Sequence, residues 1–250
     1  MCSSDLDVDY FNERGIMLTN TPDVLTESTA DLGFTLIMSS ARRVAELDAW
    51  TKAGQWQASV PPALFGSDVH GKTLGIVGMG NIGAAIARRG RLGFNMPILY
   101  SGNSRKTAVE QELGAQFRSL DQLLAEADFV CLVVPLSEKT RHLISRRELG
   151  LMKKSAILVN ISRGPVVDEP ALIEALQNGT IRGAGLDVYE KEPLAESPLF
   201  ALKNAVTLPH IGSATHETRE AMANRALDNL RSALLGERPQ DLVNPQVFKG

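Results

Sequence analysis

The residues of this sequence that could do chemistry follow one another in a fixed order. A glycine-rich segment, Gly78–Gly83 (GMGNIG), is followed by Arg163, Asp187, Glu192 and His210. Glycines at this spacing are typical of a loop that binds the phosphates of a dinucleotide. A cation, acidic residues and a histidine can bind an anionic carbonyl compound and move a proton. The combination predicts exchange of a proton and a hydride between a dinucleotide and a polar carbonyl.

Each glycine of the loop has a separate role in binding phosphate. Gly78 permits a tight turn after a strand, Gly80 lets the backbone approach the pyrophosphate, and Gly83 lets the next helix pack against the sheet. The first N–H groups of that helix then face the phosphates. We therefore expect Asn81 and Ile82 to contact the cofactor together with the three glycines. A plain turn is the alternative, but the flanking strands and helix favour binding.

The end of the second strand bears on the choice between NADH and NADPH. An acidic residue there would bind the ribose 2′-hydroxyl and repel a 2′-phosphate. This chain has Ser101 at that place, followed by Arg105 and Lys106 without an acidic neighbour. Hydroxyls and positive charge favour NADPH, with NADH as a weaker second cofactor. The alternative is a solvated basic turn with no role in cofactor choice.

Four downstream residues match the needs of 2-oxo acid reduction. Arg163 follows a predicted strand and could bind a carboxylate and polarise a carbonyl. His210 is the natural general acid, and Glu192 is the carboxylate that would raise its pKa and orient its ring. Asp187 ends a strand and could hold the nicotinamide ring. Taken singly, the arginine could be a surface ion pair and the histidine a structural residue.

The elements that must position these residues alternate between strands and helices. Apolar runs predict strands at residues 73–77, 97–100, 129–134, 156–160 and 183–188, with helical patterns at 82–92 and 171–176. Continuous apolar strands separated by helices indicate a parallel sheet covered on both faces. The fold class is therefore α/β, a doubly wound parallel sheet. Amphipathic spacing predicts two longer helices, at 28–53 and 215–235.

Composition excludes several classes of function. The 250 residues are 44% apolar, and 26 basic against 29 acidic residues give a net charge of −3 without a basic run, so no nucleic-acid surface is expected. No apolar stretch reaches the roughly 20 residues that span a bilayer, so no membrane association is expected. No histidine, cysteine and acid cluster has metal-ligand spacing, and no metal is expected. Cys2 and Cys131 are not expected to pair, which fits a cytoplasmic location.

The motifs together resemble those of the D-2-hydroxyacid dehydrogenase family. The resemblance runs from about Asp7 to the C-terminus. Its most specific segments are GMGNIG at 78–83, VPL at 134–136, NISRGPVVD at 160–168, GLDVYEKEP at 185–193 and LPHIGSAT at 208–215. Two further segments, NMPILY at 95–100 and HIGSATHETR at 210–219, resemble the glyoxylate/hydroxypyruvate reductases, also described as 2-ketogluconate reductases.

The resemblance implies a role for each matching residue. It implies that Arg163 binds substrate and activates its carbonyl, that His210 protonates the carbonyl oxygen, and that Glu192 tunes His210. The other residues implied to contact the cofactor are Val134, Pro135, Thr140, Ile161, Ser162, Asp187 and Gly212. It also implies a homodimer to which the helix at 28–53 contributes. One departure concerns NADPH, because relatives that prefer NADP often have arginine where this chain has Asn103 and Ser104.

The resemblance further implies a Rossmann-type cofactor domain at 25–214 and an incomplete flavodoxin-like substrate domain. Residues 1–24 would be a remnant of that split domain, completed by the helix and tail at 215–250. Residues 1–6 lack apolar periodicity, and Cys-Ser-Ser-Asp-Leu can be encoded by TGC TCT TCC GAT CT, which resembles the end of a sequencing adapter. We therefore expect these residues not to be native, a hypothesis that resequencing the locus tests.

Two functions of different classes remain open at this point. One is an NADPH-dependent reductase of glyoxylate, hydroxypyruvate or 2-ketogluconate. The other is a dinucleotide-binding fragment without turnover. The acid–histidine pair favours the enzyme, while the shortened front of the substrate domain favours the fragment. Within the enzyme class, oxidation of phosphoglycerate or D-lactate is a further alternative, because loops that set specificity would lie before Asp7.

Overall fold

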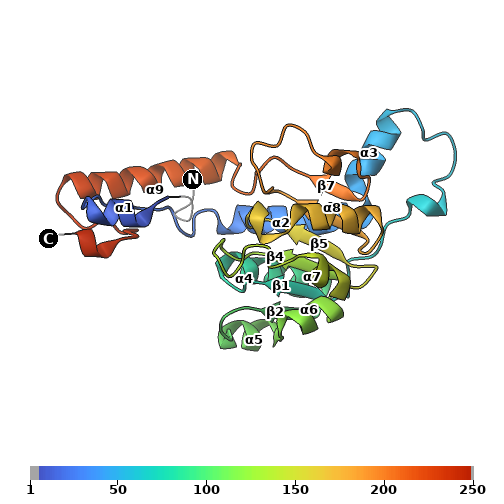
Figure 1. Cartoon of the computed structure of the whole chain (residues 1–250), viewed down its shortest axis with the longest axis horizontal. Coiled ribbons are helices and arrows are strands. Elements are labelled where there is room, and N and C mark those ends of the chain that lie inside the picture. The colour runs from blue at the N-terminus through green and yellow to red at the C-terminus, as the bar shows by residue number, and fades with distance from the viewer. Residues whose placement is uncertain (1–5, 249–250) are drawn as a thin grey trace. The chain divides into compact units, whose positions relative to one another are not determined.

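Seven parallel strands form one sheet, in the order β3-β2-β1-β4-β5-β6-β7 (Figure 1). The computed structural model describes residues 6–248. The strands are β1 (Leu74–Val77), β2 (Ile98–Ser101), β3 (Gln116–Phe117), β4 (Phe129–Leu132), β5 (Ile157–Asn160), β6 (Gly183–Leu186) and β7 (Ala205–Thr207). Every neighbouring pair is parallel. The chain reverses its direction of winding at β1, so the predicted doubly wound α/β class is confirmed.

Helices cover both faces of this sheet, with one hydrophobic core under each layer. These helices are α2 (Thr26–Arg42), α4 (Asn81–Arg88), α5 (Thr107–Leu113), α6 (Leu120–Glu126), α7 (Arg146–Leu151) and α8 (Glu169–Gln177). A further helix, α3 (Val44–Lys52), has no buried residue and joins neither core. Buried residues of α2, α4 and α5 join one core, which includes Leu36 and Ile86. Residues of α6, α7 and α8 join the other, which includes Leu123 and Leu172. Burial on both faces explains why the strand sequences are continuously apolar.

Two compact units divide the chain, one at residues 29–212 and the other formed by residues up to 28 together with 213–250. The first holds the whole sheet. Within the second lie α1 (Val8–Glu13) and α9 (His216–Leu234). Asn229, a buried residue of α9, donates from Nδ2 to the backbone oxygen of Asn20 at 3.2 Å. The hypothesis that residues 1–6 are not native concerns a segment of which residues 1–5 lie outside the described part.

The predicted single helix at 28–53 is wrong, because the chain breaks at Arg43. Arg43 adopts a left-handed conformation with φ +56°, between the end of α2 and the start of α3. The backbone oxygen of Ala41 accepts a hydrogen bond from Ser67 N–H at 2.8 Å instead of continuing the helical ladder. The C-terminal helix matches its prediction closely, since α9 occupies 216–234 against the predicted 215–235.

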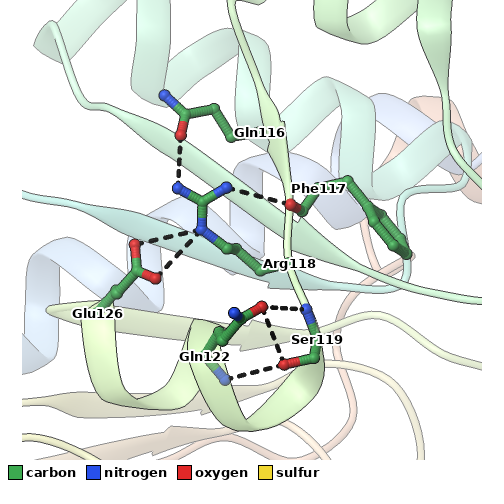
Figure 2. Close-up of polar contacts among 6 residues, drawn as sticks. All are labelled: Gln116, Phe117, Arg118, Ser119, Gln122 and Glu126. Atoms are coloured by element: carbon green, nitrogen blue, oxygen red, sulfur yellow. Dashed lines mark hydrogen bonds and ion pairs between the residues drawn. The ribbon is translucent and has the colours of Figure 1, made fainter.

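The short edge strand β3 is followed at once by α6, and polar side chains fix both (Figure 2). Arg118 donates to Gln116 Oε1 at 2.7 Å and to Glu126 Oε1 at 3.1 Å. Ser119 and Gln122 form a capping box, in which each side chain bonds the backbone of the other at 3.3 and 3.1 Å. These bonds satisfy the first N–H groups of α6 and define where the helix begins.

Candidate active site

The glycine-rich loop joins β1 to α4 at the carboxyl end of the sheet. Gly78 has φ +101°, and a Cβ there would lie 2.8 Å from the backbone oxygen of Val133, so no larger residue fits. A Cβ on Gly83 would lie 2.4 Å from the backbone oxygen of Gly78, because α4 begins directly against the loop. A Cβ on Gly80 would meet no protein atom within 4 Å. The space over Gly80 is therefore open to a ligand.

A cleft of about 510 Å³ lies over this loop. Of the residues predicted to contact the cofactor, those that line it are Gly78, Gly80, Ser101, Lys106, Val134, Pro135 and Thr140. Ser104 and Lys139 add a hydroxyl and a second ammonium group to its lining. Backbone N–H groups, hydroxyls and cations are the groups that bind phosphates and ribose. The residues present thus fit a dinucleotide.

Arg105 does not line this cleft, because its guanidinium is held elsewhere. Its Nε and Nη2 atoms lie 3.0 and 2.8 Å from the two carboxylate oxygens of Glu110. The Glu110 carboxylate also accepts the Tyr100 hydroxyl at 2.6 Å. The hydrogen bonds from Arg105 and Tyr100 hold the pKa of Glu110 below its usual value. The predicted contact of Arg105 with the cofactor therefore stays a prediction.

Asn160 organises the turn that presents Arg163. Asn160 is buried at the end of β5, and its Oδ1 accepts the backbone N–H of Ser162 at 3.0 Å and the Ser162 hydroxyl at 2.7 Å. Its Nδ2 donates to the backbone oxygen of Arg163 at 3.1 Å. Ser162 and the backbone of Arg163 are therefore fixed by the last residue of the strand. Ile161 and Ser162 are the residues of this turn that were predicted to contact the cofactor. Both lie outside the residues that line the cleft over the glycine loop.

The Arg163 guanidinium is available to an anionic ligand. Its Nη1 donates to the backbone oxygen of Ser162 at 2.6 Å. No carboxylate of residues 6–248 lies within ion-pair distance of it. The next residue, Gly164, touches the backbone of Tyr189, since a Cβ on Gly164 would lie only 1.7 Å from the Tyr189 carbonyl. This contact brings the Arg163 turn beside the segment that carries Glu192.

Glu192 and His210 form a pair, with 2.6 Å between Oε2 of the glutamate and Nδ1 of the histidine. The other carboxylate oxygen of Glu192 accepts the backbone N–H of Tyr189 at 2.9 Å. With Nδ1 engaged by the carboxylate, Nε2 is the ring nitrogen that can exchange a proton with a ligand. The pair lines a largely apolar cavity of about 480 Å³ whose other lining residues include Leu194 and Phe200.

Asp187 is buried directly behind the His210 turn. Its two carboxylate oxygens accept the backbone N–H groups of Ile211 and Gly212, at 2.8 and 2.9 Å. Burial raises the pKa of Asp187, although these two hydrogen bonds oppose the rise. The Thr29 hydroxyl donates to the backbone oxygen of Gly212 at 3.1 Å. The predicted contact of Asp187 with the nicotinamide stays a prediction. The sequence did not indicate that Asp187 also holds the backbone of the two residues after His210.

Several residues that build the site were missed by reasoning from the sequence. Tyr189 donates its hydroxyl to the backbone oxygen of Leu208 at 2.9 Å, two residues before His210. Asn160, Thr29 and Glu110 likewise act through hydrogen bonds to backbone or to other side chains. Of these residues, only Asn160 and Tyr189 could have been found from the sequence, because they lie within the specific motifs at 160–168 and 185–193.

Neither a metal centre nor a membrane span is found in the described part of the chain. Within residues 6–248, no three histidine, cysteine or acidic side chains cluster so as to hold a metal ion. In the same range, no helix has the length and apolar character needed to cross a membrane.

Comparison with known proteins identifies the family. Residues 34–212 match the family described as D-isomer specific 2-hydroxyacid dehydrogenase, NAD binding domain. The chain is 56% identical over 245 residues to glyoxylate/hydroxypyruvate reductase B of Yersinia pestis (strain Pestoides F), covering 98% of this chain and 75% of that protein. It is also 56% identical over 246 residues to the enzyme of the same name from Escherichia fergusonii, covering 98% of this chain and 76% of that one.

A solved structure agrees with these sequence matches. It is that of the NADPH-dependent glyoxylate/hydroxypyruvate reductase of Sinorhizobium meliloti in complex with NADP and malonate, 35% identical with a TM-score of 0.89. The match covers 98% of this chain and 76% of that one. The chain thus spans about three quarters of the length of these relatives. Together with the sheet order and the phosphate loop, the matches show that this chain belongs to the D-2-hydroxyacid dehydrogenases, a family of NAD(P)-dependent oxidoreductases.

Proposed function

We propose that this protein reduces a small 2-oxo acid, glyoxylate or hydroxypyruvate, to the D-2-hydroxy acid with NADPH. The observation that carries the proposal is the Glu192–His210 pair, with 2.6 Å between the carboxylate and the ring nitrogen. Arg163, on the turn that contacts Tyr189, adds a guanidinium without an acidic partner among the described residues. A dinucleotide-binding protein without turnover has no use for a carboxylate that orients a histidine. The names of the Yersinia pestis and Escherichia fergusonii relatives support these two substrates.

Each residue of the constellation has a separate task in the proposed reaction. Arg163 binds the substrate carboxylate and polarises the adjacent carbonyl through its planar guanidinium. Glu192 holds Nδ1 of His210, which leaves Nε2 to deliver a proton to the carbonyl oxygen. NADPH, when bound, supplies the hydride for the carbonyl carbon. Reduction then takes one proton from His210 and one hydride, and it leaves a neutral hydroxyl group on the product.

The cofactor would be held by segments at the carboxyl ends of β1, β2, β4, β5, β6 and β7. We assign the pyrophosphate to Gly78, Gly80, Asn81, Ile82 and Gly83. We assign the adenosine ribose and its 2′-phosphate to Ser101 and Lys106, both of which line the cleft. Val134, Pro135 and Thr140 would contact the middle of the cofactor, and Ile161, Ser162, Asp187 and Gly212 its nicotinamide side.

The preference for NADPH is part of the proposal. No acidic residue stands at the end of β2, where one would repel a 2′-phosphate. Lys106 places positive charge in the same cleft. The Sinorhizobium meliloti relative is described as NADPH-dependent and was solved with NADP, which supports the same choice.

The first experiment measures NADPH oxidation by the purified chain with glyoxylate, hydroxypyruvate and 2-ketogluconate, and NADPH binding in the same sample. The reverse reaction with 3-phosphoglycerate and D-lactate completes the substrate panel. We expect turnover with glyoxylate or hydroxypyruvate and a lower kcat/KM with NADH. Arg163→Gln should raise the KM for the 2-oxo acid without changing NADPH affinity. NADPH binding without turnover on any substrate would overturn the proposal in favour of a non-catalytic fragment.

We further propose that the protein is a cytoplasmic homodimer whose substrate-binding lobe includes residues 1–24 and 215–250. The segment from α3 to β1 supports dimerisation, because Val44, Trp56 and Phe65 are 51%, 63% and 57% exposed there. Large apolar side chains on one segment are typical of a surface that a partner covers. The buried free thiol of Cys131 fits a reducing compartment. Light scattering of the wild type and of Trp56→Ser tests the dimer.

A further inference from the structure

Glu110, a residue of α5 outside the lining of the cofactor cleft, accepts hydrogen bonds from the turn that carries Arg105 and Lys106. Its carboxylate accepts hydrogen bonds from Arg105 Nε and Nη2 at 3.0 and 2.8 Å, and from the Tyr100 hydroxyl at 2.6 Å. The same Tyr100 hydroxyl accepts the backbone N–H of Lys106 at 2.7 Å. One carboxylate thus fixes the end of β2, the side chain of Arg105 and the backbone of Lys106.

The two neighbouring cations are placed differently by this network. Lys106 lines the cleft over the glycine loop, together with Ser101 and Ser104. The Arg105 guanidinium is bonded to Glu110 through a bidentate pair and is absent from that lining. The Glu110 side chain is only 16% exposed, so the pair is partly shielded from solvent on its acidic side.

We propose that Glu110 is a specificity-determining residue for the cofactor, because it withholds Arg105 from the 2′-phosphate and presents Lys106 to it. The inference rests on the proposed assignment of this cleft to NADPH. An arginine neutralised by a carboxylate contributes little attraction to a phosphate, whereas a free one binds it through charge-assisted hydrogen bonds. Glu110 therefore leaves only one of the two cations of this turn, Lys106, facing the cleft.

Glu110→Gln separates the hydrogen bond that holds Tyr100 from the charge that holds Arg105. The glutamine oxygen can still accept the Tyr100 hydroxyl, so the turn keeps its shape, but the negative charge that holds Arg105 is gone. A released Arg105 should strengthen binding of the 2′-phosphate and leave the 2′-hydroxyl of NADH unaffected. We expect NADPH affinity to rise about three- to tenfold while NADH affinity changes less than about twofold.

The experiment measures dissociation constants for NADPH and NADH without substrate, by quenching of protein fluorescence. It uses the wild type, Glu110→Gln, Arg105→Ala, the double variant and Lys106→Ala. Arg105→Ala should leave both affinities unchanged, and Lys106→Ala should weaken NADPH binding about tenfold. The gain from Glu110→Gln should vanish in the double variant, because it depends on Arg105 being present.

Three results would overturn the inference. One is an equal change of both affinities in Glu110→Gln, another is a gain that persists without Arg105, and the third is an Arg105→Ala variant as impaired as Lys106→Ala. If Glu110→Gln does not fold, the Arg105 and Lys106 variants, both at exposed positions, can still be compared. That comparison decides whether Lys106 and not Arg105 binds the 2′-phosphate. A wild type that binds NADH more tightly than NADPH would refute the proposed NADPH preference. The role of Glu110 could still be tested, because the change in the ratio of the two affinities between the wild type and Glu110→Gln would remain measurable.

Discussion

Oδ1 of Asp187 lies 2.8 Å from the backbone nitrogen of Ile211, the residue that follows His210. His210 itself has φ +54°, a left-handed conformation that costs a non-glycine residue about 1–3 kcal/mol. Such a conformation persists only where its surroundings impose it. The following two residues are held because their backbone N–H groups donate to the two carboxylate oxygens of Asp187 and because the Thr29 hydroxyl donates to the backbone oxygen of Gly212. The orientation of the His210 ring is thus set by the backbone that carries it.

Asp187→Asn should therefore damage catalysis through the position of His210. The asparagine NH₂ group would face one backbone N–H that has lost its acceptor, at a cost of about 1–3 kcal/mol. We expect kcat to fall at least about tenfold while NADPH still binds. Steady-state kinetics and thermal melting measure the two effects. Asp128→Asn is the matched control, because Asp128 also accepts a backbone N–H but at the opposite end of the strands.

A variant that melts at a lower temperature but keeps the wild-type kcat would contradict this assignment. The destabilisation alone is expected from any buried carboxylate that holds backbone N–H groups. The loss of kcat is specific to the residue that braces the His210 turn.

His210→Gln and Glu192→Gln should be impaired to different degrees. The first removes the proton donor, and we expect a rate loss of several orders of magnitude with NADPH binding intact. The second keeps the histidine but loses the charged acceptor 2.6 Å from Nδ1, and about a 10- to 100-fold loss is expected. Single-turnover rates with hydroxypyruvate measure both. Equal activity of His210→Gln and the wild type would refute the role of general acid.

Much of the fold is predictable from local pattern. Five of the strands, β1, β2, β4, β5 and β6, are apolar runs bounded by glycine or polar residues, because both faces of the sheet are buried. The two edge strands β3 and β7 are only two and three residues long and offer no pattern to read. The break at Arg43 was missed because it depends on a tertiary bond between Ala41 and Ser67.

In the candidate site, too, features set by neighbouring residues can be predicted, whereas contacts between residues distant in sequence cannot. Spacing alone indicates the phosphate loop, since its glycines act within six residues of chain. Side-chain charge alone suggested Arg105 as a ligand of the cofactor. The pairing of Arg105 with Glu110 depends on how α5 returns beside β2, and a single sequence does not reveal that geometry. The backbone contacts of Asp187, Tyr189 and Thr29 were missed for the same reason, because each residue acts on backbone that is distant in sequence.

Gly80→Ala and Gly83→Ala should separate cofactor binding from folding. The backbone of Gly80 is extended, with φ −87° and ψ −163°, and an added methyl group meets no protein atom within 4 Å. Gly80→Ala should fold with wild-type stability but bind NADPH at least about tenfold more weakly, because the methyl group enters the cleft. Gly83→Ala should lose about 1–3 kcal/mol of stability, because its Cβ would lie 2.4 Å from a backbone oxygen.

Urea unfolding and NADPH titration measure these two glycine variants in parallel. Wild-type NADPH affinity in Gly80→Ala would exclude that part of the loop from the cofactor site. A Gly83→Ala variant as stable as the wild type would show that α4 can retreat from the loop.

Stability should depend on pH through Asp128, which lies just before β4. Its carboxylate accepts the backbone N–H of Thr73 at 2.9 Å and pairs with Lys153 Nζ at 2.9 Å. Burial raises the pKa of Asp128, but the bonds from Lys153 and Thr73 together lower it by more. The net shift of the pKa is therefore downward from 3.8. A lowered pKa in the folded state means stabilisation that is present above pH 3.8 and lost as the pH falls through the folded value.

Asp128→Asn should therefore be less stable than the wild type by about 1–2 kcal/mol at pH 7. The difference should shrink as the pH falls below about 4, because Asp128 of the unfolded wild type then binds a proton while the folded carboxylate stays charged until a lower pH. Urea unfolding followed by circular dichroism between pH 7 and pH 3 measures it. Asp121→Asn, which breaks an exposed pair with Arg147, is the control and should change stability by less than about 1 kcal/mol throughout. A difference between Asp128→Asn and the wild type that stays constant with pH would mean that packing, and not charge, accounts for the effect.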